Sequence, residues 1–329
     1  MDSLDTNTKI VTKKKNINML SSIEKVGIII PTYNPDNEFD FLCTVLAKMD
    51  CPVLVIDSST NSFAEETTKR YGFQFIKISQ NEFNHGFTRE KGRKMLMTEV
   101  SVFLTQDVIP YSENFVQLLT EPLLSGQASA AYSKQSPKTG ADLFEAAPRV
   151  FNYDDNSTLK SKSNVEKLGV FTSFISNSCA AWLNKDLDEI GGFQTTLTNE
   201  DYLAATKLIE NGKSIAYVAN SIVFHSHKYS LWKEFQRYFD TGYVRGINPW
   251  IQEVVGSAND RGAMLASFMW KECLKQTPWK LPYLFAVLTV KFLGYKIGFL
   301  GSKLPLKVKL FFSDQSYYWS SKFYLSQRK

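Results

Sequence analysis

Three short polar clusters in the sequence carry side chains that could bind a metal ion or move a proton. In chain order they are residues 105–107 (Thr-Gln-Asp), 199–201 (Asn-Glu-Asp) and 225–227 (His-Ser-His). A carboxylate such as Asp107 can hold Mg²⁺ or Mn²⁺ together with diphosphate oxygens and water, and the neutral imidazoles of His225 and His227 could complete that site. The acids Glu200 and Asp201 could instead accept a proton from an attacking hydroxyl. Each cluster taken singly is also consistent with a solvated strand end or an acidic helix start.

The clusters are preceded by a regular alternation of mostly apolar runs and helical patterns. Runs of strand length cover residues 26–30, 53–56, 73–78 and 102–104, and helical spacing covers residues 39–49, 62–71 and 87–98. Apolar strands that alternate with amphipathic helices predict βαβ units and a parallel sheet with helices on both faces. Ligands bind such sheets at the carboxyl ends of the strands, where Thr32, Tyr33, Asp57 and Asp107 lie.

The sequence lacks two common phosphate-binding loops. No Gly-x-Gly-x-x-Gly follows the first strand and no Walker Gly-Lys-Ser/Thr is present, which argues against a nicotinamide dehydrogenase and a P-loop kinase. If this sheet binds a nucleotide, a metal ion held by carboxylates is the expected substitute for the glycine-rich loop.

Composition indicates a globular, cytosolic protein with a basic C-terminal part. Among its 329 residues, 43% are hydrophobic and 22% charged, which excludes wholesale disorder. The four cysteines form no Cys-x-x-Cys pair, so reduced thiols are expected. The net charge is +5, but residues 261–329 contain 12 Lys and Arg against two acids. This asymmetry predicts an anionic partner.

An acidic membrane surface is the expected anionic partner, since no nucleic-acid-binding module is recognisable. The apolar window from Leu281 to Leu300 contains Lys291 and Lys296, and mid-span charges are costly. The window therefore favours a helix that lies in the membrane interface over one that crosses it. Residues 229–247 have helical spacing of aromatic side chains and are expected to form core or the walls of an acceptor groove.

Seven segments, in this order, resemble inverting family-2 glycosyltransferases with the GT-A fold. The stretches around residues 83–86 and 104–107 are most similar to the rhamnosyltransferase branch. The segments are Val26–Pro35, Val55–Ser58, Asn84–Arg89, Leu104–Pro110, Ser176–Ala181, Asn199–Asp201 and His225–His227. The resemblance implies an α/β fold whose Rossmann-like, mostly parallel sheet is flanked by helices, with a C-terminal basic, aromatic helical extension. The expected divisions are a flexible leader (1–23), a GT-A domain (24–245) and a membrane-associating helical extension (246–329).

The resemblance also implies a nucleotide-binding role for several residues. Residues 31–33 (Pro-Thr-Tyr) match the lining of a pyrimidine nucleoside pocket, and Asp57 matches an acid that hydrogen-bonds the base. Arg89 matches an arginine near the base and phosphates. Gln106 stands where relatives carry the first acid of an Asp-x-Asp motif, so Asp107 is expected to be the main carboxylate ligand.

For catalysis, the resemblance implies that Asp201 is the base, with Glu200 beside it. One or both of His225 and His227 match the position that reaches the metal or the diphosphate. The stretch that contains Asn177 and Ser178 matches a segment beside the donor sugar and the acceptor. Trp182, which follows it, is expected in the core.

The implied function is the transfer of L-rhamnose from dTDP-β-L-rhamnose to a hydroxyl of a glycan acceptor, expected to be lipid-linked, in bacterial surface polysaccharide synthesis such as O-antigen or capsule. The expected cofactor is Mg²⁺ or Mn²⁺, and the expected location is the cytoplasmic face of the cell membrane. Alternatives are the same fold with another donor, such as UDP-galactofuranose or UDP-glucose, and a non-catalytic nucleotide-sugar-binding scaffold. Donor choice depends on the pocket around the sugar hydroxyls, which the sequence does not resolve.

Overall fold

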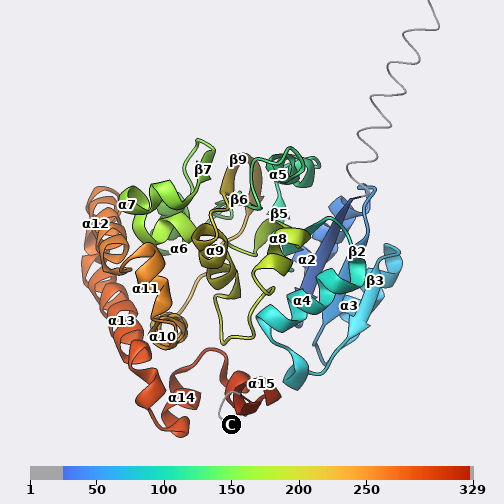
Figure 1. The fold of residues 1–329 in the computed structure, drawn as a ribbon. Coiled ribbons are helices and arrows are strands. Elements are labelled where there is room, and N and C mark those ends of the chain that lie inside the picture. The colour runs from blue at the N-terminus through green and yellow to red at the C-terminus, as the bar shows by residue number, and fades with distance from the viewer. Residues whose placement is uncertain (1–24, 327–329) are drawn as a thin grey trace, which may run out of the picture.

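The computed structural model describes residues 25–326 (Figure 1). The predicted flexible leader of residues 1–23 lies outside the described residues. A nine-stranded sheet, in the order β3-β2-β1-β4-β8-β6-β9-β5 with β7 paired to β9, runs through the body, and helices cover both of its faces (Figure 1).

The N-terminal half of the sheet is parallel, as the sequence predicts. It contains β1 (Val26–Thr32), β2 (Val53–Asp57), β3 (Gln74–Lys77) and β4 (Val100–Leu104). These strands alternate with α2 (Asn37–Leu46), α3 (Phe63–Arg70) and α4 (His85–Leu96). All five residues of β2 and of β4 are buried, which fits strands covered on both faces.

The second half of the sheet is mixed, so parallel pairing extends less far than the alternation of strands and helices suggests. β8 (Cys179–Leu183) lies antiparallel between β4 and β6 (Ala130–Ser136), and β6 is parallel to β9 (Ile215–Phe224). Two short strands, β5 (Ile109–Pro110) and β7 (Thr158–Lys160), pair antiparallel with β9. The antiparallel neighbours β4 and β8 are far apart in the sequence, so local periodicity carries no trace of their pairing.

Successive side chains of β1 point to opposite faces of the sheet, so the hydrophobic core has one part on each face. Ile28 and Ile30 pack with α2 and α5 (Phe115–Leu124), whereas Ile29 packs on the other face with α8 (Asn184–Glu189) and α9 (Glu200–Glu210). Two further helices, α6 (Leu143–Asn152) and α7 (Val165–Leu168), precede β8.

The predicted C-terminal extension is helical. It begins within the last turn of α10 (Leu231–Ile247) and contains α11 (Trp250–Val255), α12 (Asn259–Gln276), α13 (Leu281–Phe299), α14 (Leu306–Phe312) and α15 (Lys322–Ser326). The backbones of α10 and α13 touch at glycines: a Cβ on Gly298 would lie 2.0 Å from the Phe239 carbonyl oxygen, and one on Gly242 would lie 2.2 Å from that of Tyr295. The predicted boundary at residue 246 falls in α10, which packs with the residues that follow it. The division into domains there remains a prediction.

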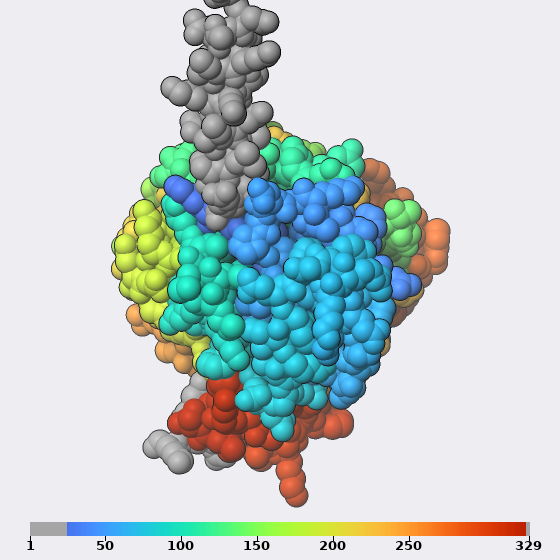
Figure 2. Space-filling model, turned by 90° about the vertical axis from the view of Figure 1, so that its right-hand side faces the viewer, coloured from blue at the N-terminus to red at the C-terminus, as the bar shows by residue number. Residues whose placement is uncertain are grey.

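The chain returns to its N-terminal half at the C-terminal end. Tyr317 packs its ring against Phe83, and Phe323 packs against Phe87 at the start of α4. Figure 2 shows the C-terminal segment (red) below the N-terminal part of the chain (blue to cyan). The helical extension therefore encloses one side of the body and contacts both of its halves.

Candidate active site

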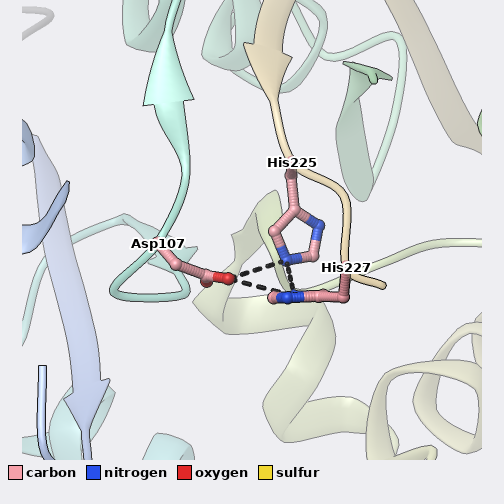
Figure 3. Close-up of side chains that lie close together, drawn as sticks. All are labelled: Asp107, His225 and His227. Atoms are coloured by element: carbon pink, nitrogen blue, oxygen red, sulfur yellow. Dashed lines mark hydrogen bonds and ion pairs between the residues drawn. The ribbon is translucent and has the colours of Figure 1, made fainter. Parts of the chain in front are cut away.

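Asp107, His225 and His227 converge as the sequence predicts (Figure 3). The Asp107 Oδ2 atom lies 3.0 Å from His227 Nε2 and 3.4 Å from His225 Nε2, and the two imidazole nitrogens are 3.0 Å apart. All three candidate ligand atoms lie within 4.8 Å of one another. One carboxylate oxygen and two imidazole nitrogens form a donor set that suits a divalent metal ion.

A two-residue strand brings this group together. β5 begins two residues after Asp107, and its Ile109 pairs with Phe224, the residue before His225. The antiparallel register thus places the loop after β4 beside the end of β9. The sequence reading placed the two clusters at strand ends, but β5 is too short to give a periodic signal.

Neighbouring groups orient His225 for metal binding. Its Nδ1 lies 3.0 Å from Gln135 Oε1, and a proton on Nδ1 turns the Nε2 lone pair toward Asp107 and His227. Burial lowers the pKa of His225 to about 4, so the ring is neutral near pH 7 and able to ligate. Burial opposes ionisation of Asp107, but its close contacts with the His225 and His227 imidazoles outweigh that effect and hold the pKa of Asp107 below its ordinary value. Electron-rich atoms that converge in this way fit a cation between them.

The second group of the site is formed by Glu200 and Asp201, the first two residues of α9. Asn177 donates a hydrogen bond to each of these acids. The Asn177 backbone N–H donates to Asp201 Oδ2 (3.0 Å), and its side-chain amide donates to Glu200 Oε1 (3.2 Å). Trp182, fully buried as predicted, donates from Nε1 to Asn177 Oδ1 (2.8 Å) and fixes the amide. Asn199, directly before the acids, has φ +62°, a left-handed conformation that asparagine tolerates better than most residues.

The pKa values of the two acids are shifted in opposite directions. Glu200 is buried, which disfavours its charge, but its ion pair with Arg89 (Oε1–Nη1 2.7 Å) outweighs this and lowers the pKa of Glu200. Burial and then the Glu200 charge raise the pKa of Asp201 to about 7. The arrangement therefore supplies a fixed negative charge beside a carboxylate that gains and loses a proton near neutral pH, as a general base requires.

One cavity of about 600 Å³ contains both groups. Asp107, His225 and His227 line it together with Glu200, Asp201, Arg89, Asn177 and Ser178. The sequence reading missed several further lining residues, which are Arg149, Tyr229, Arg237, Arg245 and Arg261. Only the expectation of an acceptor-groove wall over residues 229–247 anticipated some of them.

The residues assigned to the nucleoside lie at the ends of β1 and β2 and do not line this cavity. Pro31 and Thr32 pair in register with Ile56 and Asp57. Thr32 Oγ1 donates to Asp57 Oδ1 (2.8 Å), while Lys77 Nζ contacts Asp57 Oδ2 at 2.6 Å. Both Asp57 oxygens thus already accept from the protein, and base recognition by Asp57 remains a prediction.

Gln106 joins the two regions. Its amide makes two hydrogen bonds with the Tyr33 backbone, from Tyr33 N–H to Oε1 (2.8 Å) and from Nε2 to Tyr33 O (3.1 Å). Gln106 therefore ties the loop after β1 to the loop that carries Asp107. The Tyr33 side chain itself is 48% exposed. Arg89 lies with Glu200 rather than beside Thr32 and Asp57, and its contact with a nucleotide also remains a prediction.

Comparison with known proteins identifies close relatives. The chain is 34% identical over 308 residues to the O-antigen chain rhamnosyltransferase WbaN of Salmonella anatum, covering 92% of this chain and 98% of the relative. It is 35% identical over 315 residues to the O-antigen chain rhamnosyltransferase RfbN of Salmonella typhimurium strain LT2, covering 93% and 99%. No protein-family model matches the chain.

Solved structures share the fold at low sequence identity. The mannosyltransferase PcManGT from Pyrobaculum calidifontis, in complex with GDP-Man and Mn²⁺, superposes with a TM-score of 0.58 at 14% identity over 85% of this chain and 88% of that one. Residues 1–349 of TarS from S. aureus, in complex with UDP-GlcNAc, give a TM-score of 0.51 at 14% identity over 92% of each chain. The GT-A fold predicted from the sequence is confirmed.

Proposed function

This chain belongs to the family of O-antigen chain rhamnosyltransferases, and we propose that it transfers L-rhamnose from dTDP-β-L-rhamnose to a hydroxyl of a lipid-linked glycan during O-antigen synthesis. Two relatives that match the chain over nearly its full length are named O-antigen chain rhamnosyltransferases, which supports rhamnosyl transfer. The observation that carries the proposal is one cavity that contains a carboxylate with a pKa of about 7 and a separate Asp-His-His group.

Asp201 is the base in this proposal. Its carboxylate accepts the proton of the acceptor hydroxyl as that oxygen attacks the anomeric carbon. The Asn177 and Tyr202 backbone N–H groups hold one Asp201 oxygen each, at 3.0 and 2.7 Å, so the carboxylate is oriented before the substrate arrives. Attack opposite the leaving diphosphate inverts the anomeric configuration, and a β-L-rhamnosyl donor yields an α-L-rhamnoside.

Asp107, His225 and His227 would hold Mg²⁺ or Mn²⁺, and a bound divalent ion offsets negative charge that develops on a leaving diphosphate. The residues fit such an ion, since buried His225 is kept neutral and directed at Asp107. Thr32, Tyr33 and Asp57 would bind the nucleoside, and Gln106 would keep that loop in register with Asp107. Arg89 would hold Glu200 charged and thereby set the basicity of Asp201.

The C-terminal helices would place the enzyme on the cytoplasmic surface of the membrane, where a lipid-linked acceptor is presented. Among residues 25–326, one helical stretch, Pro278–Phe299, is long and apolar enough to cross a membrane. However, its Lys291 pairs with Glu234 of α10 at 3.1 Å and its glycines touch the α10 backbone. These contacts favour an interfacial position, in which exposed Phe285 and Phe292 enter the lipid surface.

Point variants test the membrane proposal better than truncation does. Tyr318, Trp319, Phe323 and Tyr324 share a core cluster with Leu203 of α9, so deleting residues 281–329 would damage the body itself. Replacing Phe285 and Phe292 together by Gln should release the protein from phosphatidylglycerol-containing vesicles in a sedimentation assay. The control is Phe41→Gln, which replaces an exposed phenylalanine of α2 and should not release the protein from the vesicles. Equal sedimentation of the Phe285 and Phe292 double variant and of the Phe41→Gln control would contradict the membrane proposal.

A donor panel tests the transfer reaction. The full chain, with Mg²⁺ or Mn²⁺ and a lipid-linked glycan fraction as acceptor, is given dTDP-rhamnose, UDP-glucose, UDP-galactose, UDP-galactofuranose or UDP-N-acetylglucosamine, and release of the nucleoside diphosphate is followed. We expect metal-dependent turnover of dTDP-rhamnose alone, reduced about 10²-fold or more by Asp201→Asn with dTDP affinity unchanged. Turnover of a UDP-sugar would overturn the donor assignment, and donor binding with no turnover would support the scaffold.

A further inference from the structure

The cavity carries more positive charge than the proposed donor explains. Five arginines line it, against three carboxylates. Arg89 is paired with Glu200. For the other four, Arg149, Arg237, Arg245 and Arg261, the part of the chain that the structure describes offers no acid within ion-pairing distance. A divalent ion in the Asp-His-His group would offset the two negative charges of a nucleoside diphosphate sugar, so the surplus of two positive charges, from five arginines and three carboxylates, remains for another anion.

Two of these arginines belong to the metal end of the cavity. Arg149 Nε donates to the His225 carbonyl oxygen at 2.9 Å. The Arg237 guanidinium lies 4.4 Å from the ring centroid of Tyr229, which in turn contacts His227. These two are placed to meet the donor diphosphate.

The other two belong to the wall around the base. Arg245 of α10 lies 4.0 Å from the ring centroid of Tyr202, the residue after Asp201. Arg261 of α12 lies 4.0 Å from the ring centroids of both Phe151 and Phe171. The Tyr202 hydroxyl donates to the carbonyl of Val170, next to Phe171. The two guanidinium groups are therefore linked through Tyr202, Val170 and Phe171, along a wall that begins at the residue after Asp201.

The energetics of these two arginines indicate a missing anion. Arg245 is only 8% exposed, and a buried charge without a counter-charge is unfavourable. Arg261 Nη2 donates to Asn152 Oδ1 (2.9 Å) and to the Phe151 carbonyl oxygen (3.3 Å), which are neutral acceptors, while Arg261 Nε is buried without a hydrogen-bond partner and burial lowers the pKa of Arg261. The aromatic rings hold both planar groups in fixed orientations, which reduces the entropy lost when they bind an oxyanion.

We propose that Arg245 and Arg261 bind a phosphate or diphosphate group of the acceptor, and that this enzyme recognises its glycan through that group as well as through the sugar. The inference rests on the proposed function, because it takes Asp201 as the position of the attacking hydroxyl. A glycan joined to its lipid through a diphosphate is the chemical class that would satisfy both the arginines and the base. Arginine is suited to this role because its donors match phosphate oxygens in pairs.

Calorimetric titration of the full chain tests the inference. The protein is first saturated with dTDP, with Mg²⁺ in excess over all phosphates, and is then titrated with farnesyl diphosphate, inorganic pyrophosphate or farnesol. We expect farnesyl diphosphate and pyrophosphate to bind to the dTDP complex and farnesol to bind much more weakly. Arg245→Gln and Arg261→Gln should each weaken diphosphate binding roughly tenfold or more and change the affinity for dTDP less than twofold. Arg70→Gln, which changes an exposed side chain at the end of α3, should change neither affinity.

The outcomes separate this inference from the donor assignment. Diphosphate binding that is unaffected by both cavity variants, or a loss of dTDP affinity equal to the loss of diphosphate affinity, would overturn it. Failure of the native chain to bind dTDP would count against the proposed donor only, and the same arginine dependence of diphosphate binding would then still support the inference. Retained dTDP affinity shows that each variant is folded, and Arg245→Lys, which keeps the charge, should lose less affinity than Arg245→Gln.

Discussion

Glu200→Gln tests whether Asp201 is the base and whether its neighbour sets its basicity. Burial and the Glu200 charge, in that order, raise the pKa of Asp201 from 3.8 to about 7. Glutamine keeps the oxygen that accepts from Arg89 and Asn177 but removes the negative charge. Loss of a negative neighbour favours the ionised form of Asp201, so its pKa falls and the acid limb of the rate profile moves to lower pH.

The expected size is that of removing one neighbouring charge. Burial is the larger cause of the raised pKa of Asp201 and the Glu200 charge is the second, so Glu200→Gln should remove part of the shift and not all of it. A tenfold change in proton affinity, about one pH unit, is the order of magnitude expected for one close charge. In the native enzyme kcat/KM should therefore rise with pH to half its plateau near pH 7, and in Glu200→Gln the midpoint should lie about one unit lower.

The assay is nucleoside diphosphate release at limiting substrate between pH 5 and 9, and the midpoint is compared rather than the plateau. The matched control is Glu65→Gln, whose carboxylate forms an exposed surface pair with Lys69. A midpoint that is unmoved, or that moves to higher pH, would refute the coupling of Glu200 to the base. A profile without an acid limb near neutral pH would refute the assignment of Asp201.

Three further changes test the other parts of the site and its support. Asp107→Asn should abolish tight divalent metal binding in a titration with Mn²⁺, and the native chain should bind Mn²⁺ more tightly than Mg²⁺, because two of its three candidate ligands are nitrogens. Gln106→Ala removes both bonds to the Tyr33 backbone and should raise the KM for the donor roughly tenfold, with Mn²⁺ affinity unchanged. Gly298→Ala would place a Cβ 2.0 Å from a carbonyl oxygen of α10 and should destabilise the protein by about 1–3 kcal/mol in urea unfolding. Gly262→Ala, with no atom within 4 Å of the added carbon, should not.

Local sequence patterns predicted much of the fold but only part of the site. The first four strands were legible because they are mostly apolar runs that alternate with helical patterns, and the residues at their ends were assigned to the site for that reason. The pairing of β8 with β4, the two-residue strand β5 and the shared donor Asn177 all join residues that are distant in sequence. Periodicity reports which face of an element is apolar and not which element it meets.

The same reasoning explains why the arginines were missed and what the C-terminal helices do. Arg261 lies in the part of the chain that the sequence assigns to a membrane-associating extension, and Arg245 is the last residue before it, yet both line the cavity that contains Asp201. Leu203, two residues after Asp201, packs in one core cluster with Trp319 and Tyr324 from the end of the chain. A truncation near residue 246 would remove Arg261 and unpack the first turn of α9, so loss of membrane binding and loss of activity would coincide in such a variant. The helices thus form one wall of the cavity that contains Asp201, and substitutions on their outer face are needed to separate the proposed membrane contact from the proposed catalysis.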